Sequence, residues 1–556
     1  MPLRRLRQMA LKIEDTPGTF DTAVLAAAYA GHLIRDASLE PDVTLYSSDA
    51  LRGTLTPVEG VPTRQAAKAS FGIEMRGASS GTTPAWDVAM QGCGMTSREL
   101  VKVTAGTSFA ISGGPLRHGQ TISQATGTTR FSGKVFGDVY NGATSIYLYD
   151  CTGVINTSTN LTGSSPSVTV TPTGNWSATY AAGRGWAPAT YKTWMLRTNG
   201  SALTGGTVAV GDVLTGGTST AKAVVSEVYG YFMTVTSVSG TVAVGDECVG
   251  GTSSARAYVY EVVTTSTFRV IITSGSFTGT EALTFYHRAG SSATATRASE
   301  SQHEFVVRPY KPTPFSNGET VSVGGVSFTA AASAATVQRD MPTLSGALYE
   351  DGVVKKATGM RGTLTLNAKV GEPGMLSFDF TGAWQGVADA QNLSGVTYAL
   401  QAPPVFLSAG ALLGTESNPT VAPSYAPRFS SLSLNLGHAV VYREDANASS
   451  GVLEASITGR AGSGSIDPEL DLEASYPALT NLLAGNGCNF SCYIGTTLTN
   501  KFRVSCPGIL LSGAPSADRN GEAVRTLNFS LTGGHYENSS DTPGSENDLL
   551  IAYLVA

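Results

Sequence analysis

Internal repetition is the feature of this sequence that most restricts its fold, because a chain that repeats itself builds its structure from repeated units. The segment GTVAVGDVLTGGTSTAKAVVSEV begins at Gly206 and returns as GTVAVGDECVGGTSSARAYVYEV at Gly240, a period of 240 − 206 = 34 residues. A degraded third copy over 274–285 places Glu281 one period after Glu247. Apolar and polar residues alternate between Gly-Asp or Gly-Gly pairs. This predicts strand–turn–strand units that stack and bury a shared face.

A longer repetition relates the two ends of the chain. Residues 84–92 read PAWDVAMQG, and residues 477–485 read PALTNLLAG. Proline at the first turn and glycine after the last one are typical of a short helix, so each segment predicts one amphipathic helix. The apolar positions that correspond are Trp86, Ala89 and Met90 in the first helix and Leu479, Leu482 and Leu483 in the second.

Strands of similar pattern are predicted around both helices. The closing strands are LSFDFTG at 376–382 and LNFSLTG at 527–533, and the preceding strands are SFGIEMRG at 70–77 and VLEASITGR at 452–460. Alternation places every second side chain on one face. The expected buried sets are Leu376, Phe378 and Phe380; Leu527, Phe529 and Leu531; Phe71, Ile73 and Met75; and Leu453, Ala455 and Ile457. The order strand, helix, strands, closing strand thus occurs twice and predicts a duplicated, mostly antiparallel β domain.

The spacing between these landmarks locates an insertion. From helix end to closing glycine is 533 − 485 = 48 residues in the second copy and 382 − 92 = 290 in the first, a difference of 290 − 48 = 242. Insertions of this size are tolerated in surface loops because the cost of loop closure rises slowly with length. The predicted organisation is a first domain in two parts, 1–109 and 336–400, an inserted β-rich region at 110–335 with repeats at 206–239, 240–273 and 274–285, a linker at 401–426, and a second domain at 427–556.

Charge limits the partners of this chain. Charged residues make up only 14%, and the net charge is −6. A protein that holds nucleic acid needs clustered basic residues, and the only dense cluster is Arg4, Arg5 and Arg7. Stable nucleic-acid binding is therefore not expected, whereas passive contact with DNA stays open. The start MPLRRLRQMALKIED lacks the apolar run of a secretory signal, and no stretch is long and apolar enough for a membrane helix. A soluble chain made in a cytoplasm is expected.

Motifs for chemistry are weak throughout the sequence. No nucleophile elbow, P-loop, zinc-protease or dinucleotide motif is present, and the histidines share no ligand spacing. The pair Cys488 and Cys492 lacks a second pair or a nearby histidine to complete a zinc site, so buried thiols are expected. We therefore predict no catalytic, cofactor-binding or metal-binding residue, no cofactor, and no enzyme.

Three further patterns have an ordinary structural interpretation beside a functional one. The acidic run Asp467, Glu469, Asp471 and Glu473 could offer oxygen ligands to Ca²⁺ but lacks the spacing of a calcium loop, and a solvated or lumen-facing acidic strand is the simpler interpretation. Asn447 begins a glycosylation sequon that has meaning only on a secretory route. The aromatic residues Trp176, Tyr180, Trp186, Tyr191 and Trp194 could bind sugars or bases, although aromatics also dominate ordinary β cores.

The arrangement resembles the tail tube (major tail) proteins of long-tailed, siphovirus-like double-stranded DNA bacteriophages. The resemblance is carried by ALKIEDTPGTFDTA, HLIRDASLEPD, LRGTLTPVEGVPTRQAAKASFGIEMRG and TPAWDVAMQGCGM near the N-terminus. It continues in LYEDGVVKKATGMRGTLTLNAKVGEPGMLSFDFTG, PRFSSLSLNLGHAVVYRED and APSADRNGEAVRTLNFSLTGG. It covers residues 10–108 and 340–556 and leaves the insertion outside the pattern.

The resemblance implies a structural virion protein. Such subunits form rings that stack into a hollow tube for genome ejection, with a β-sandwich or β-barrel fold, a flanking helix, and sheets that join across subunits. Together with the duplication and the insertion derived above, it predicts two tandem tail-tube-like domains, each with a short helix, plus an inserted decoration domain. Because the chain is duplicated, a trimer with pseudo-six-fold symmetry is favoured over a hexamer.

Further partners and a location follow from the same resemblance. They are the tape measure, tail terminator and tail tip proteins, transient passage of double-stranded DNA, no membrane, and a location in the virion tail after assembly in the host cytoplasm. A channel that must not hold its cargo is expected to be acidic or neutral.

Two other classes of function stay open on the sequence. A surface adhesion or carbohydrate-binding β protein is favoured by the Ser/Thr/Gly-rich composition and the aromatic residues of the insertion. A phage-borne glycan hydrolase would need two close carboxylates in a cleft, which a sequence cannot reveal.

Overall fold

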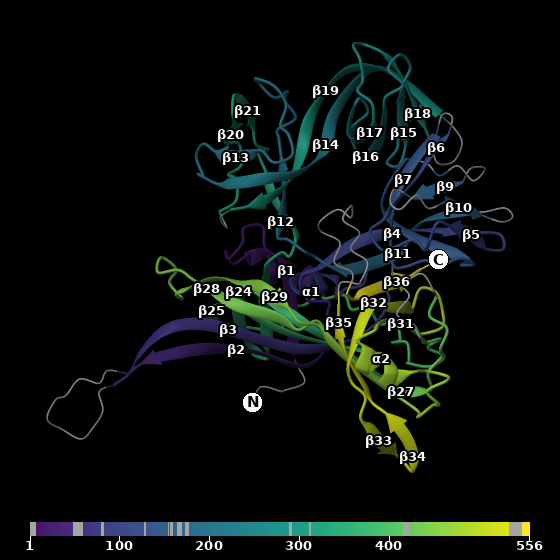
Figure 1. Ribbon diagram of the computed structural model, residues 1–556. Coiled ribbons are helices and arrows are strands. Elements are labelled where there is room, and N and C mark those ends of the chain that lie inside the picture. Colours follow the sequence, from purple (N-terminus) through teal and green to yellow (C-terminus); the bar gives the residue numbers. More distant parts are fainter. Residues whose placement is uncertain are drawn as a thin grey trace.

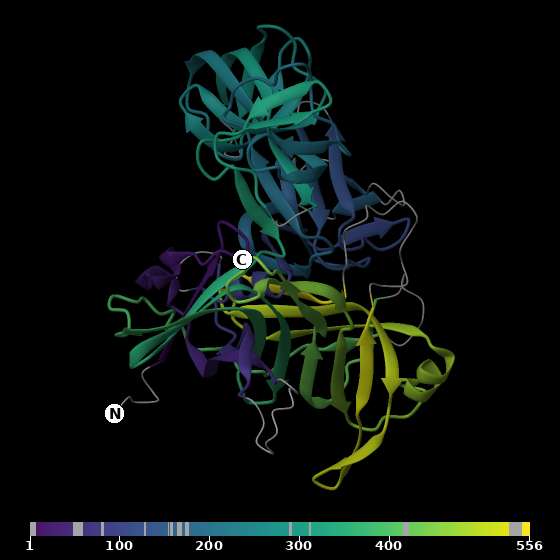
Figure 2. The same ribbon diagram turned by 90° about the vertical axis from the view of Figure 1, so that its left-hand side faces the viewer.

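The protein is a mainly β molecule, with 60% of its residues in strands and 4% in helices. A computed structural model describes residues 7–47, 59–78, 83–126, 129–153, 155, 160–163, 169–172, 177–287, 292–310, 313–414, 422–532 and 548–555. Figure 1 shows a broad β body below and a β lobe above it, with β6 (Thr121–Thr126), β7 (Thr129–Val135), β9 (Leu161–Gly163) and β10 (Thr169–Pro172) of the body reaching up beside the lobe, and Figure 2 shows the same parts from the side.

The body is built on a sheet network of 21 strands. Its strands are β1 (Arg7–Ile13), β2 (Ile34–Tyr46), β3 (Val61–Glu74), β4 (Met95–Thr104), β5 (Phe109–Ser112), β6 (Thr121–Thr126), β7 (Thr129–Val135), β8 (Ser145–Gly153), β9 (Leu161–Gly163), β10 (Thr169–Pro172), β11 (Ser177–Pro188), β23 (Leu344–Glu350), β24 (Gly352–Lys369), β25 (Met375–Ala390), β26 (Leu412–Leu413), β27 (Phe429–Asn435), β30 (Ser463–Pro468), β31 (Gly487–Ile494), β32 (Lys501–Gly513), β35 (Leu527–Leu531) and β36 (Leu550–Leu554).

The lobe is a second sheet, of 11 strands. Its strands are β12 (Thr193–Arg197), β13 (Val213–Gly216), β14 (Lys222–Ser239), β15 (Glu247–Gly250), β16 (Arg256–Thr264), β17 (Thr267–Ser274), β18 (Ala282–Tyr286), β19 (Ser292–Pro309), β20 (Thr320–Val323), β21 (Val326–Thr329) and β22 (Thr336–Asp340). The region 110–335, predicted as an insertion, therefore contributes strands to both sheets.

The remaining elements are short. Two separate hairpins are β28 (His438–Glu444) with β29 (Val452–Arg460), and β33 (Ser516–Arg519) with β34 (Glu522–Arg525). The helices are η1 (Thr22–Leu25), η2 (Ala27–Tyr29), α1 (Asp87–Gly92) and α2 (Ala478–Ala484). Within the described residues, no helix has the length and hydropathy needed to span a membrane.

The body contains two four-strand antiparallel units of the same order. The first half is β2–β3–β25–β24, and the second half is β27–β30–β35–β32. β24 of the first half also pairs with β27 of the second, so the sheet continues from one half into the other. One cluster of buried side chains, from Met9 to Tyr553, runs through both halves.

The two halves also agree in register. Ile73 of β3 pairs with Leu376 of β25, and Ile466 of β30 pairs with Leu527 of β35. The strands before the helices are thus offset by 466 − 73 = 393 residues. The proline before each helix is offset by 477 − 84 = 393 as well, so strand and helix keep the same spacing in both halves.

Three of the four predicted buried faces are confirmed. The alternating apolar residues of β3 and its extension, of β25 and of β35 are all buried, namely Phe71, Ile73, Met75, Leu376, Phe378, Phe380, Leu527, Phe529 and Leu531. Alternation was sufficient here because each strand has one face on the core and one outside.

The fourth predicted face is wrong. The strand that precedes α2 as β3 precedes α1 is β30, and β29 pairs instead with β28 in a separate two-stranded sheet. Of the predicted residues only Ala455 is fully buried, while Leu453 and Ile457 are half-buried. Gly437, with a positive φ of 60°, lies between β27 and β28, and residues 461–462 lie between β29 and β30. β29 therefore leaves the plane of the second half.

Both helices lie where the sequence predicted them, but they bury different faces. Trp86, Ala89 and Met90 of the first segment are fully buried. In α2 Leu479 is 41% and Leu483 is 86% exposed. The predicted match between the apolar faces is therefore wrong for the second helix, which ends as predicted at Gly485 with a left-handed φ of 63°.

In the lobe, the third repeat segment does not form the unit of its own that the sequence predicts. β13 and β15 start 247 − 213 = 34 residues apart, and each begins a hairpin. β18, in the third segment, pairs with β15 and closes the second unit, while β20 pairs with β13 and closes the first. The expected stack of three units is therefore replaced by two modules with separate cores, joined by the long strands β14 and β19.

A buried carboxylate marks the same turn in both modules. Glu281 accepts hydrogen bonds from the backbone N–H groups of Thr252, Ser253 and Thr278. Glu319 accepts them in the same way from Thr218, Ser219 and Ser316. The structural counterpart of Glu281 is thus Glu319, 319 − 281 = 38 residues later, rather than Glu247.

Candidate assembly interface

The joint between the two halves is the feature of the body with the clearest functional meaning. Thr365–Lys369 of β24 run antiparallel to Ser431–Asn435 of β27, with Leu366 opposite Leu434. Both leucines are fully buried. Two β units are thus joined edge to edge through backbone hydrogen bonds and share one core, which is how a sheet extends between subunits as well as within one.

The hairpin β28–β29 of the second half lies on the first half. The Gln65 N–H donates to the Ser450 carbonyl oxygen over 2.9 Å. Arg64 pairs with Glu444 at 2.9 Å, and its guanidinium lies 4.8 Å from the ring centroid of Tyr442. These contacts hold the hairpin against β3, so the joint consists of a strand pair and a covering hairpin.

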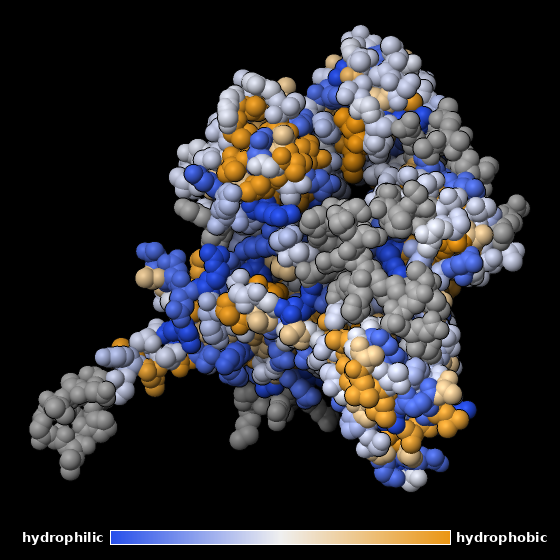
Figure 3. All heavy atoms as spheres, viewed as in Figure 1, coloured by the Kyte–Doolittle hydropathy of each residue, from blue (hydrophilic) through white to orange (hydrophobic). Residues whose placement is uncertain are grey.

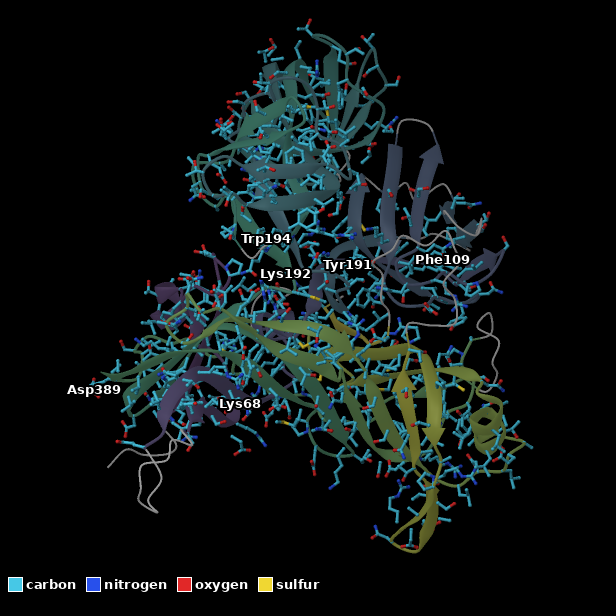
Figure 4. The ribbon with its side chains drawn as sticks, turned by 60° about the vertical axis from the view of Figure 1, so that its left-hand side comes forward. Lys68, Phe109, Tyr191, Lys192, Trp194 and Asp389 are labelled. Atoms are coloured by element: carbon cyan, nitrogen blue, oxygen red, sulfur yellow. The ribbon has the colours of Figure 1, made fainter. Side chains whose placement is uncertain are left out.

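A buried ion cluster fastens this hairpin. Glu454 of β29 is 1% exposed and accepts from Lys192 at 3.0 Å, Arg361 at 3.3 Å and Arg443 at 2.5 Å. Arg361 is 2% exposed and also donates to the carbonyl oxygens of Met341 and Ala455. One carboxylate therefore connects both halves of the body with the segment that leads into the lobe, near the labelled Lys192 in Figure 4.

Electrostatics in this cluster follow from burial and charge. Burial alone would raise the pKa of Glu454, but the charges of Arg361 and Lys192 outweigh it and the pKa is lowered. Burial lowers the pKa of Lys192 to about 8, and repulsion by Arg361 acts in the same direction. A charge held in such a place depends on its partners, because desolvation is costly once a partner is lost.

A second surface of interest surrounds α2. Leu479 and Leu483 of the helix, with Leu470 and Leu472 just before it, are exposed apolar side chains. Figure 3 shows hydrophobic residues gathered on this part of the body. In the first half the corresponding helix is covered, since Trp86 packs against Trp186 of β11 with ring centroids 4.6 Å apart. Exposed apolar groups that lie together mark contact surfaces more often than isolated ones do.

The residues that the sequence singled out for chemistry have local structural roles. Asp467 accepts from the backbone N–H groups of Ser430 and Ser431 and pairs with Arg519 at 3.2 Å. Glu469 also pairs with Arg519, at 3.2 Å. Asp467 and Glu469 therefore tie neighbouring strands together, while Asp471 and Glu473 are exposed to solvent. A lumen-facing position of this run stays a prediction.

The cysteines and histidines are dispersed through the fold. Cys93, Cys248, Cys488, Cys492 and Cys506 are buried thiols, and burial raises the pKa of Cys492 to about 12. Within the described part of the chain, no group of three or more His, Cys, Asp or Glu residues is placed to hold a metal ion. His32, His118, His303 and His438 are buried at four separate places, and His535 lies outside the described residues.

The aromatic residues of the predicted insertion do not form one cluster. Trp186 is buried in the body, where its indole N–H donates to Asp87 over 2.6 Å, and Trp194 is buried in the lobe. Tyr191 is 40% exposed and has the Arg308 guanidinium 3.9 Å from its ring centroid. Figure 4 shows Tyr191, Lys192 and Trp194 where the lobe meets the body. Trp176 lies outside the described residues.

Ion pairs line the cleft between lobe and body, which encloses about 250 Å³. Arg98 of β4 pairs with Asp340 of β22 at 3.1 Å and with Asp150 of β8 at 3.4 Å. Asp340 also accepts from the Thr193 hydroxyl over 2.6 Å. These contacts orient the lobe on the body, and the sequence held no signal for them because their partners lie far apart along the chain.

No protein-family model matches the chain, and no curated protein matches it.

Proposed function

We propose that this chain is a structural virion protein that polymerises as stacked rings into the hollow tail tube of a long-tailed double-stranded DNA bacteriophage. The proposal starts from the resemblance of residues 10–108 and 340–556 to tail tube proteins. The two four-strand units that these residues build, with a short helix in each half, are in keeping with that family.

One observation carries the proposal: the edge-to-edge joint between two four-strand units of equal order and register. In this proposal each four-strand unit corresponds to one tail-tube-like domain, so the chain carries two such domains in tandem. Repeating the same joint between chains extends the sheet into a ring, and closure of the ring removes the exposed edges that a single subunit leaves.

The duplication also favours a particular ring. Two tube-like domains per chain give a trimer with pseudo-six-fold symmetry, with a ring of six whole chains as the alternative. The lobe then takes the role of an outward decoration, since Figures 1 and 2 show it standing away from the body. The channel is proposed to be acidic or neutral, with tape measure, terminator and tip proteins as neighbours, in the virion tail.

Negative-stain electron microscopy of the purified full chain tests this function. We expect long hollow tubes or stacked rings, and three chains per ring after averaging. Rings of six whole chains would overturn the trimer. Discrete particles without a channel, at concentrations and salt conditions that span those of a cell, would overturn the tube.

The second candidate, an adhesion or carbohydrate-binding protein, has less support. Two of the aromatic side chains that suggested it, Trp186 and Trp194, are fully buried. Among the described members of that aromatic set, Tyr191 is the exposed one. A glycan array probed with the full chain would favour this candidate if it gave specific binding that a Tyr191→Ala variant lost.

A further inference from the structure

We infer that the second copy of this chain docks through two specific strand edges: β2 of one copy pairs with the strand edge around Gly513 of the next. The inference rests on the proposed function and deepens it by naming the interface. It is argued from the joint inside the chain, which serves as the template for the joint between chains.

The first edge follows from the equivalence of β27 and β2. In the internal joint Asn435 of β27 pairs with Ser463 of β30. The offset of 393 residues makes Ser70 of β3 the counterpart of Ser463, since 463 − 70 = 393. Ser70 pairs with Ser38 of β2. Ser38 therefore stands in the first half where Asn435 stands in the second.

The second edge follows from the equivalence of β24 and β32. Thr365 of β24 pairs with Asn435 across the joint and with Ser377 of β25 on its other side. The closing strands LSFDFTG and LNFSLTG make Asn528 the counterpart of Ser377, with 528 − 377 = 151. Asn528 pairs with Gly513 of β32. Gly513 therefore stands in the second half where Thr365 stands in the first.

Inside the chain Thr365 meets Asn435, so between chains Gly513 is expected to meet Ser38. Among the described residues, neither Ser38 nor Gly513 has a strand partner on its outer side: β2 pairs with β3, and the pairing of β32 with β31 ends at Leu510. Next to Ser38, the Ala37 carbonyl oxygen accepts from Arg7 over 2.8 Å, and this bond has to open for the pairing. Figure 1 shows β2 and the β33–β34 hairpin on opposite sides of the body, so one copy presents one edge to each neighbour.

Apolar side chains near the first edge are exposed to solvent and could be covered by a second copy. Val43, Leu45, Tyr46 and Val61, on the distal part of the β2–β3 hairpin, are all exposed. The corresponding hairpin of the second half, β28–β29, is instead packed on the first half through Arg64 and the Glu454 cluster. The same packing between copies would cover the β2–β3 hairpin with the second half of a neighbour.

Such an interface is heterologous, because the two edges differ. A heterologous contact gives a closed ring or an open helix according to the rotation it imposes. Each chain has one internal joint and forms one further joint with the next chain. A closed ring therefore contains twice as many joints as chains.

A pair of cysteines tests the register in the full chain. Residues opposite each other in antiparallel strands have Cα atoms about 4.5–5.5 Å apart, within the range of a disulfide. A side chain at Gly513 has room, since its Cβ would meet Asn528 Nδ2 at 3.6 Å. The Ser38→Cys/Gly513→Cys variant is oxidised under mild conditions, resolved on a non-reducing gel, and imaged in parallel.

The expected result is a covalent ladder that ends at a closed circle of three chains. The matched control is Ser38→Cys/Ser516→Cys, which shifts one thiol by three residues, or about 10 Å along the strand, and should give no ladder. Each single variant controls for the native thiols.

The outcomes separate the two proposals. A ladder together with tubes supports both, and a ladder without tubes supports the interface and overturns the tube. Tubes without a ladder, or an equal ladder from the shifted control, overturn the interface and leave the tube standing. Neither tubes nor a ladder overturns both.

Discussion

At the scale of single residues, the most consequential side chain is Glu454. It is buried and is surrounded by Lys192, Arg361 and Arg443 from three separate segments. No sequence pattern marks such a cluster, because its members are brought together only by the packing of the second half's hairpin on the first half. Alternation along β29 instead predicted Leu453 and Ile457 as the buried residues, and so pointed to the wrong face.

Replacing Glu454 by Gln is expected to destabilise the body strongly. The substitution leaves Arg361, which is 2% exposed, without its ion-pair partner. Breaking a buried ion pair from one side typically costs about 3–5 kcal/mol. Urea unfolding followed by tryptophan fluorescence measures the change. The matched control is Glu444→Gln, which removes an ion pair to Arg64 from a more exposed site and should cost less than about 1 kcal/mol. Equal losses would contradict the role assigned to the cluster.

His118 is expected to make stability depend on pH. Burial lowers its pKa to about 3, and Lys134 acts in the same direction. Its Nδ1 accepts from the Gly137 N–H over 3.1 Å, which requires the neutral ring. The unfolded chain takes up a proton near its ordinary pKa of about 6.5. The stability from this group is therefore complete above pH 6.5 and is lost as the pH falls towards 3.

The loss at pH 5 amounts to about 2 kcal/mol, from a difference of roughly 1.5 pH units at 1.36 kcal/mol each. His118→Asn keeps an acceptor and cannot titrate. We expect the difference in unfolding free energy between pH 7.5 and pH 5 to shrink by about that amount. His32, whose pKa burial lowers to about 4, keeps part of the dependence. An unchanged difference in the variant would show that His118 is protonated in the folded protein.

At the scale of elements, the sequence predicted positions better than partners. Both helices and the strands with Phe71, Leu376 and Leu527 were placed correctly, because alternation and helix-end residues act locally. The pairing of β30 rather than β29 with β35, and of β20 rather than a third repeat with β13, depends on segments far apart in the chain. Local sequence patterns cannot predict such long-range contacts. The assembly edges at Ser38 and Gly513 became visible only from the observed registers.

Removing one exposed leucine of α2 is expected to impair assembly without unfolding the chain. Leu483→Ser changes a side chain that is 86% exposed, so the unfolding free energy should shift by less than about 0.5 kcal/mol. If the surface around α2 is a contact between copies, the concentration needed for tubes should rise several-fold in sedimentation assays. Leu400→Ser, at a site 77% exposed, is the matched control and should assemble normally. Normal assembly of Leu483→Ser would place α2 outside the contacts.

At the scale of the whole molecule, the lobe stands as a separate unit on the body. It has its own two cores, the chain enters it before Thr193 and leaves it after Asp340, and its strands β16 and β17 also contact β8 of the body. These two residues pair across β12 and β22, so their Cα atoms lie about 5 Å apart. The chain therefore leaves the body and returns to it at nearly one point, which is the geometry that lets an insertion fold without disturbing its host.

Excising the lobe is expected to leave the body able to fold and assemble. The variant joins Thr193 to Asp340 through Asn-Gly, a two-residue link suited to antiparallel neighbours. It retains the Lys192–Glu454 and Arg98–Asp340 pairs on the body side. Electron microscopy should show tubes of smaller outer diameter, with the same channel and ring spacing as tubes of the full chain prepared in parallel. If the excised chain folds by circular dichroism but forms no tubes, the lobe belongs to the interface between copies rather than to the outside of the ring.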